Sequence, residues 1–212
     1  HIPGHYINAW NFNKVIHEPT YSGNYGPVEC IMGGQRVFTD KGCVAIEEIQ
    51  KNDTIGNVTV LDVVKNYCDD ELIKFPKDCF GLNVTSEDLW VTHDHIMYDP
   101  IQKKLENAGV MFDKYPFVEL LEPPVKYVYN IVLSHWGLIE VHNMKCETLC
   151  PLNRVSMQVY SENKIDTQFT SEYAGCYTTN DITIDGNVIV PKLKTTPKAL
   201  AMDKSIGSMV SC

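Results

Sequence analysis

The sequence contains no long hydrophobic run and has a shortage of positive charge. None of its apolar stretches approaches the roughly 18 consecutive residues that a membrane-spanning helix needs, so we predict no membrane span. Its 18 Lys and Arg residues are outnumbered by 27 Asp and Glu residues, and the formal net charge is -9. Because nucleic-acid binding depends on a concentrated positive field, we predict no nucleic-acid partner.

Metal and disulfide patterns are also missing. The eight cysteines form no Cys-x-x-Cys pair and follow no regular disulfide spacing. No short paired spacing supports a zinc site made from a cysteine and a histidine, and we predict neither a metal nor a cofactor. The histidines considered are His93, His95, His135 and His142. The cysteines outside the motifs described below, interpreted as thiols or as disulfides in an exported protein, are Cys43, Cys68, Cys79, Cys150, Cys176 and Cys212.

The composition that remains is that of an ordinary globular protein, with 212 residues of which 44% are hydrophobic. It divides the chain into three parts. Residues 1–29 are rich in Tyr, Asn, His, Gly and Pro and predict an extended N-terminal arm. Residues 30–150 carry strand signals. Residues 151–212 are polar, with a predicted hairpin at residues 182–190, and we interpret them as a C-terminal β appendage.

Short runs of β-branched and aromatic residues recur between residues 30 and 150, separated by Gly, Asn, Asp and Pro. This pattern predicts an all-β domain. The expected strands cover residues 36–39, 58–61, 89–92, 127–133 and 138–141. The one convincing helical pattern is short and covers residues 44–49.

Three motifs occur in order within this domain. The first begins with Cys30 and continues through residues 35–55. The second is a Thr-x-x-His motif, formed by Thr92 and His95 at the end of a predicted strand, where a hydroxyl and an imidazole can converge on one carbonyl. The third is a predicted hairpin over residues 127–146, which brings His, Asn and Cys close together.

In their order and spacing, these motifs resemble those of the Hint superfamily, the hedgehog/intein self-processing fold. Cys30 is similar to the start of the family's N-terminal motif, and Thr92 with His95 is similar to its T-x-x-H motif. Residues 128–143 are similar to its "V-Y-(D/N)-(I/L)-x-V … H-N" block. The resemblance implies an all-β Hint-type fold over residues 30–150, with residues 1–29 as an extein-like arm.

The resemblance also implies that the chain cleaves its own backbone. Cys30 would attack the carbonyl of Glu29 and convert the peptide bond into a thioester by an N-to-S acyl shift. His95 would donate a proton to the departing amine, and Thr92 would hold the scissile amide or the histidine. A second nucleophile would then resolve the thioester. The substrate in this interpretation is the chain's own flanking segments.

Two registers are open for the last motif. In the first, His142 assists cyclisation of Asn143 and the chain breaks there, with Met144 where full splicing requires Cys, Ser or Thr. In the second, residues 141–146 resemble the "V-N-G-x-x-C" hairpin of hedgehog-type and von Willebrand-associated Hint domains. Asn143 is then a turn residue, and Cys146 is a second thiol near the active centre. We favour the second register because the pattern continues after Cys146.

Two residues depart from the family pattern. Asn52 stands where Gly is usual, which turn geometry tolerates. Asn130 replaces an Asp common in inteins and removes a group that could tune the Cys30 thiol.

The flanking segments suggest a different class of function, because neither looks able to fold alone. The second hypothesis is therefore a catalytically inactive Hint-like module of a larger assembly, such as a virion or fibre-like particle, with protein partners there.

Overall fold

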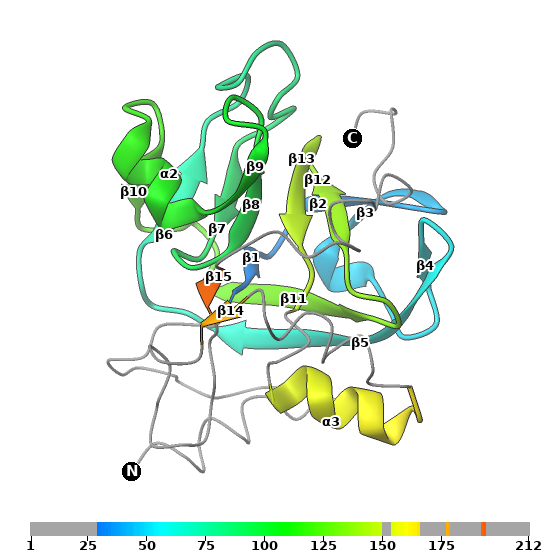
Figure 1. The fold of residues 1–212 in the computed structure, drawn as a ribbon. Helices are drawn as coiled ribbons and strands as arrows, with labels where there is room; N and C mark the ends of the chain where they lie inside the picture. The colour runs from blue at the N-terminus through cyan, green and yellow to red at the C-terminus, as the bar shows by residue number, and fades with distance from the viewer. Residues whose placement is uncertain (1–28, 150–153, 166–176, 179–191, 194–212) are drawn as a thin grey trace.

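The computed structural model describes residues 29–149, 154–165, 177–178 and 192–193 (Figure 1). Their regular structure is almost entirely antiparallel β, as the sequence predicts. The larger sheet has seven strands in the spatial order β10 (Glu119–Leu121), β6 (Leu72–Phe75), β7 (Leu89–Val91), β1 (Ile31–Met32), β11 (Tyr127–Leu133), β5 (Val58–Tyr67) and β4 (Thr54–Ile55). The second has six in the order β3 (Gly42–Ala45), β2 (Arg36–Thr39), β12 (Leu138–Val141), β13 (Met144–Glu147), β8 (Ile96–Asp99) and β9 (Lys104–Asn107).

The predicted strands agree well with these elements. β2, β11 and β12 have the expected bounds, the run at residues 58–61 is the start of β5, and the run at residues 89–92 is β7 without its last residue. The predicted helical fragment is shorter than expected, because Val44 and Ala45 end β3 and only η1 (Ile46–Glu48) is helical, as a 3-10 turn.

The sequence analysis did not predict two helices, α2 (Ala108–Lys114) and α3 (Arg154–Glu162). α3 lies in the segment interpreted as a β appendage, so residues 154–162 of that segment are helical and not β. Most residues of α3 are polar, which obscures its apolar face in the sequence. Val155, Val159 and Tyr160 are buried, and their spacing suits one helix face. The segment also contains a short strand pair, β14 (Tyr177–Thr178) with β15 (Lys192–Leu193), whereas the predicted hairpin at residues 182–190 lies outside the described residues.

The buried side chains form two apolar clusters, and the second one explains how α3 is held. It joins residues from the start of β1 and from β5 and β11 to the buried face of α3, which runs below β5 in Figure 1. The first cluster is larger and joins residues of both sheets. Members of the second cluster include Cys30, Met32, Val64, Val128, Val132, Val155, Val159 and Tyr160.

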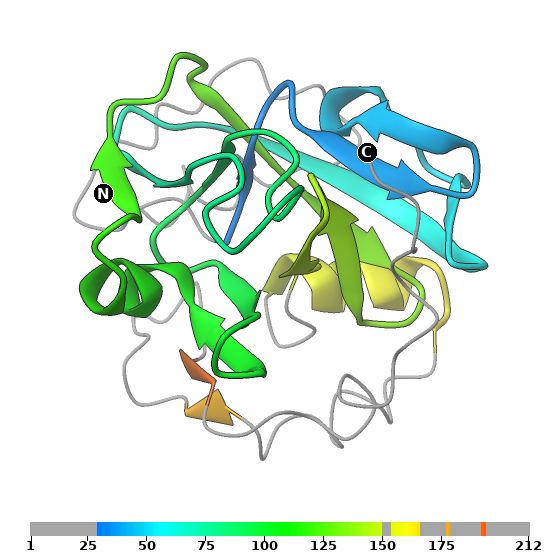
Figure 2. The same ribbon diagram turned by 90° about the horizontal axis from the view of Figure 1, so that it is seen from above.

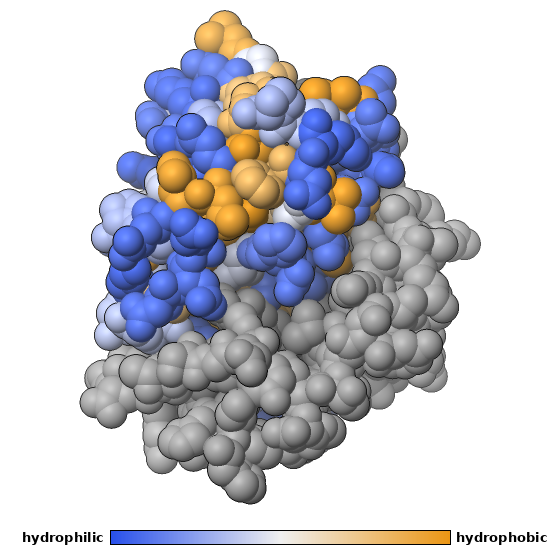
Figure 3. All heavy atoms as spheres, turned by 90° about the vertical axis from the view of Figure 1, so that its left-hand side faces the viewer, coloured by the Kyte–Doolittle hydropathy of each residue, from blue (hydrophilic) through white to orange (hydrophobic). Residues whose placement is uncertain are grey.

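Viewed from above, β1 lies between two groups of elements (Figure 2). α2, β8 and β9 lie on one side of it, and β2 and β3 lie on the other. On the outer face that carries α2 and β10, apolar side chains gather between polar ones (Figure 3), and both Val110 of α2 and Leu121 of β10 are exposed. Among the described helices, none is long and apolar enough to cross a membrane.

Candidate active site

Cys30 directly precedes β1, which lies between β7 and β11 in the larger sheet. Ile31 pairs with Val91 of β7 on one side and with Tyr129 of β11 on the other. In this antiparallel register, the residue before Ile31 is opposite Thr92 and Asn130. The sheet therefore brings together Cys30, Thr92 and Asn130, which are separated by 62 and 38 positions along the chain.

The Thr-x-x-His motif is a turn that follows β7 directly. The backbone N–H of His95 donates to the carbonyl oxygen of Thr92 at 3.1 Å, which closes the turn, and this oxygen does not accept the N–H of Cys30. The hydroxyl of Thr92 takes its place and accepts the N–H of Cys30 at 2.8 Å, while the N–H of Thr92 donates to the Cys30 carbonyl at 2.9 Å. A side-chain oxygen thus holds the nitrogen of the Glu29–Cys30 peptide bond.

The carbonyl side of the same bond is held from β11. Nδ2 of Asn130 donates to the carbonyl oxygen of Glu29 at 2.5 Å. The other amide atom, Oδ1, accepts the N–H of Ile131 at 2.7 Å, which fixes the orientation of the amide group. Asn130 is fully buried. From the sequence, Asn130 is only the loss of a titratable group, whereas in the structure its side chain is the hydrogen-bond donor to the Glu29 carbonyl.

His95 is fully buried, and its contacts determine where its proton lies. Nε2 is 3.0 Å from the carbonyl oxygen of Glu147, and because a carbonyl can only accept, Nε2 carries the proton. Nδ1 has no hydrogen-bond partner among the described residues. Burial lowers the pKa of His95 to about 4, against the opposing effect of the Glu147 and Cys30 carbonyls. The ring is therefore neutral at pH 7, with a free lone pair on Nδ1.

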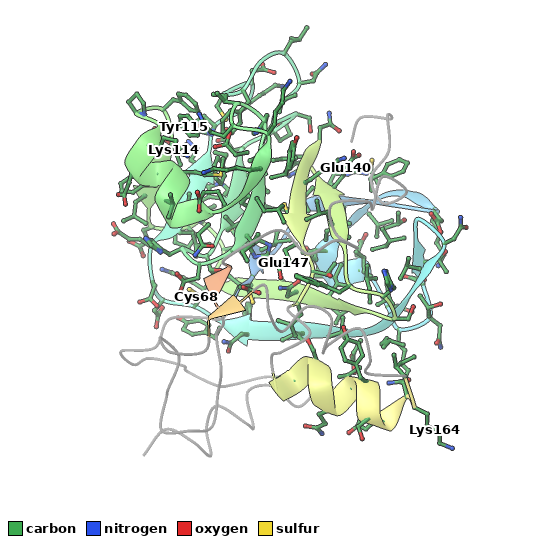
Figure 4. The ribbon with its side chains drawn as sticks, viewed as in Figure 1. Cys68, Lys114, Tyr115, Glu140, Glu147 and Lys164 are labelled. Atoms are coloured by element: carbon green, nitrogen blue, oxygen red, sulfur yellow. The ribbon has the colours of Figure 1, made fainter. Side chains whose placement is uncertain are left out.

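The thiol of Cys30 is held in its protonated form. Burial is the main cause that raises the pKa of Cys30 well above its ordinary value, and nearby Cys68 and Glu29 add to the shift. Both cysteines are free and belong to the second apolar cluster. Figure 4 shows Cys68 near the end of β5 and Glu147 above β11, in the middle of the molecule. A buried thiol of this kind needs a neighbouring base to become a nucleophile.

His142 and Asn143 are located elsewhere. They form the two-residue turn of the β12–β13 hairpin, in which Val141 pairs with Met144, and their φ angles are +48° and +65°. Nδ2 of Asn143 donates to the carbonyl of Asn83 at 3.1 Å. From this turn to Glu147, which contacts His95, the strand extends about 13 Å. This is the geometry of the second register, and the structure does not bring either residue to Cys30.

Cys146 does not join Cys30 either. It lies on β13 opposite Ile139 and Met97, and it belongs to the first apolar cluster, not the second. Burial, followed by the charge of Glu140, raises the pKa of the Cys146 thiol far above its ordinary value. The expected second thiol near the active centre is thus a core thiol, because the strand alternation turns its side chain into the other core.

The remaining cysteines and histidines form no further centre in the part of the chain that the structure describes. Cys43 is disulfide-bonded, whereas Cys68 and Cys79 are free thiols. Cys150, Cys176 and Cys212 lie outside the described residues. Within the described ranges, no three His, Cys, Asp or Glu side chains are grouped as metal ligands would be.

Comparison with known proteins finds similarity only at the level of structure. No family model matches the sequence, and no curated protein matches it. A bacterial intein-like domain from Clostridium thermocellum is 19% identical with a TM-score of 0.44, and the match covers 57% of this chain and 99% of that one. The gp41-1 intein is 15% identical (TM-score 0.41, 57% and 98% covered). A DnaB intein from Synechocystis is 10% identical (TM-score 0.38, 57% and 98% covered). These are domains of the kind that the motifs resemble, and a likeness at this level carries no conclusion about activity.

Proposed function

We propose that this chain is an autoprocessing domain that cleaves its own backbone between Glu29 and Cys30 through a thioester. One observation supports this most strongly: two side chains, one from β11 and one from the turn after β7, bond the two sides of this single buried peptide bond. Asn130 donates to the carbonyl oxygen, and Thr92 accepts from the amide nitrogen. Ordinary sheet pairing uses backbone groups for such bonds, so two side chains directed at one peptide bond favour chemistry at that bond.

The first role belongs to Asn130. When the Cys30 sulfur adds to the carbonyl carbon of Glu29, negative charge develops on the carbonyl oxygen. The side-chain amide of Asn130 already donates to that oxygen through Nδ2, and its Oδ1 accepts the N–H of Ile131, which fixes the amide in place. A preorganised donor in a buried site stabilises the developing charge by about 3–4 kcal/mol. An aspartate could donate there only when protonated, so the Asn is suited to this role.

The second role belongs to His95, which moves a proton. In the N-to-S shift, the bond between Cys30 sulfur and Glu29 carbon forms, and the bond between that carbon and the Cys30 nitrogen breaks. Nδ1 of the neutral His95 takes the thiol proton and then delivers it to the departing nitrogen, so the histidine ends as it began. The Glu147 carbonyl keeps the other nitrogen protonated throughout. Thr92 holds the departing nitrogen in place.

A second nucleophile then attacks the thioester and releases residues 1–29. We do not include Asn143 or Cys146 in this scheme. Asn143 is occupied in a hairpin turn, and the side chain of Cys146 lies in the other core cluster. The proposal is therefore cleavage at one bond, without cyclisation at Asn143.

The test is the intact mass of the full chain, with and without a small thiol or hydroxylamine. We expect loss of the 29-residue N-terminal piece (residues 1–29), accelerated by the added nucleophile. Cys30→Ala should abolish this loss. Cys146→Ala is the matched control, because it removes another fully buried free thiol from the same domain and should leave cleavage intact.

Continued cleavage in Cys30→Ala would exclude the thioester. An unchanged mass of the folded wild-type chain under all conditions would instead favour the inactive structural module.

A further inference from the structure

A pocket of about 330 Å³ opens beside the proposed reaction site. It lies between the start of β6 and the turn that follows β7. Thr92, whose hydroxyl holds the Cys30 nitrogen, forms part of its wall. The other lining residues are Asp70, Glu71, Leu72, His93, Asp94 and Leu120.

An external nucleophile needs such an opening. Glu29 and Cys30 are only 1% and 0% exposed, so the thioester that joins them is not reached from the outer surface directly. Thr92 links the pocket to the reacting bond, because its hydroxyl accepts the N–H of Cys30, its own N–H donates to the Cys30 carbonyl, and it lines the pocket. The pocket therefore adjoins the reacting bond through Thr92.

The pocket carries a negative charge that the described part of the chain does not balance. Three of its residues, Asp70, Glu71 and Asp94, are acidic and exposed. Their one recorded ion pair in the described ranges joins Asp94 Oδ1 to His93 Nδ1 at 3.3 Å, and it is a charge pair only when His93 is protonated. Residues 18–29, which precede the reacting bond, contain no Lys or Arg. The segment directly before the reacting bond thus carries no lysine or arginine side chain.

We infer that the nucleophile that resolves the thioester carries a separate positive charge, which binds in this pocket beside Thr92. The inference rests on the proposed function. The acceptor would be a molecule or peptide segment with an ammonium or guanidinium group next to its attacking atom. The two atoms must differ, because an amine bound to carboxylates stays protonated and cannot attack. The attacking atom forms a bond to the Glu29 carbon and gives its proton to the Cys30 sulfur, which leaves as the thiol.

The experiment offers the full chain an equimolar mixture of a cationic thiol, 2-aminoethanethiol, and an anionic thiol, 2-sulfanylethanesulfonate. Mass spectrometry at low conversion gives the ratio of the two N-terminal thioester products. The two thiols compete for one shared intermediate, so the ratio does not depend on how fast that intermediate forms. Division by the ratio found for a small peptide thioester in free solution removes the intrinsic reactivity of each thiol.

We expect the cationic product to be favoured about tenfold at low salt, through local concentration of the cation by the pocket's field. The preference should fall to about one in Asp70→Asn/Glu71→Gln/Asp94→Asn. The matched control, Glu48→Gln/Asp113→Asn/Glu162→Gln, removes the same charge at exposed positions outside the pocket and should keep it. If the triple pocket variant does not fold, single variants at Asp70 and Asp94 should each reduce the preference partway.

Release without charge preference, or a preference that persists in the pocket variant, would overturn this inference and leave the proposed cleavage intact. It would also favour the chain's own upstream segment as the occupant of the pocket. No release with either thiol would overturn both proposals.

Discussion

The Glu29–Cys30 bond and the β12–β13 hairpin both contain residues that the sequence marks as candidates, yet they are built differently. At the first, Thr92 from the turn after β7 and Asn130 from β11 bond the two sides of one peptide bond. At the second, His142 and Asn143 are neighbours within one turn, and their hydrogen bonds go to backbone groups of Arg36, Asn83 and Ser86, none of which is part of a reacting bond. The difference teaches that convergence of distant strands on one bond, more than a local motif, identifies the candidate site.

The two regions also differ in what their polar groups achieve. Around Cys30, buried donors and acceptors are aimed at atoms that change charge during acyl transfer, in a place with little water to screen them. In the hairpin, the polar groups satisfy a turn that needs left-handed backbone at both positions. Substitutions that keep the fold should therefore affect cleavage at the first region and not at the second.

The largest expected effect is on His95. His95→Gln keeps a donor for the Glu147 carbonyl but cannot accept and return a proton, so cleavage should slow by about 10²–10⁴-fold. The measurement is the rate of N-terminal release in a fixed excess of thiol. His142→Gln is the matched variant in the hairpin, where the imidazole is also mostly buried, and its rate should stay within about threefold of wild type. Equal losses of cleavage rate in the two variants would show that His95 has no special role in cleavage compared with a buried histidine of the hairpin.

Asn130 should give the next largest effect. Asn130→Asp presents a carboxylate to the Glu29 carbonyl in place of the N–H donor, and release should slow by about 10²–10³-fold. Lowering the pH should recover part of the rate in this variant, because a protonated Asp can donate. A merely structural Asn would give no such pH-dependent recovery. Circular dichroism would confirm that the fold is retained.

The pH dependence of stability should also distinguish the regions. His95 has a folded pKa of about 4 against an ordinary value of 6.5, so the unfolded state binds the proton more readily. Its stabilising contribution is complete above about pH 6.5 and is lost as the pH falls toward 4, for a total of about 3 kcal/mol. Urea unfolding at several pH values measures this loss.

In the His95→Gln variant, the dependence between pH 6.5 and 4 should become clearly shallower. Burial also lowers the pKa of His142, so His142→Gln removes a contribution of the same sign and serves as the comparison. If the free energy of unfolding of His95→Gln depends on pH as steeply as that of wild type, His95 is not the buried neutral histidine described here.

Much of the fold could be predicted from local patterns, and the exceptions have physical causes. β2, β11 and β12 are runs of apolar and β-branched residues bounded by turns, and their bounds were correct. α2 was missed because it is short and contains Gly109. Its first turn is held by bonds from Ala108 and Gly109 to the carbonyls of His95 and His93, contacts that no local pattern reports.

The site could be predicted in part. Cys30, Thr92 and His95 lie together as expected. Asn130 was missed because its role depends on the register between β1 and β11, which neither strand specifies alone. Cys146 was misplaced because adjacent residues of a strand face opposite sides, so the chain reaches His95 through the backbone of Glu147, the next residue.

The smallest expected effect is on Asn143, and it separates the two registers directly. Asn143 has a φ of +65°, a conformation that Asn tolerates better than Ala, so Asn143→Ala should lower the free energy of unfolding by about 1 kcal/mol. Asn143→Gly should cost less because glycine adopts this backbone readily. Neither variant should change N-terminal release. If Asn143 were instead a cyclising residue, both variants would abolish a break after Asn143 that intact mass reveals in the wild type. The two variants would then be equally defective, because both lack the side-chain amide, whereas the backbone angle predicts that Asn143→Gly is less affected than Asn143→Ala.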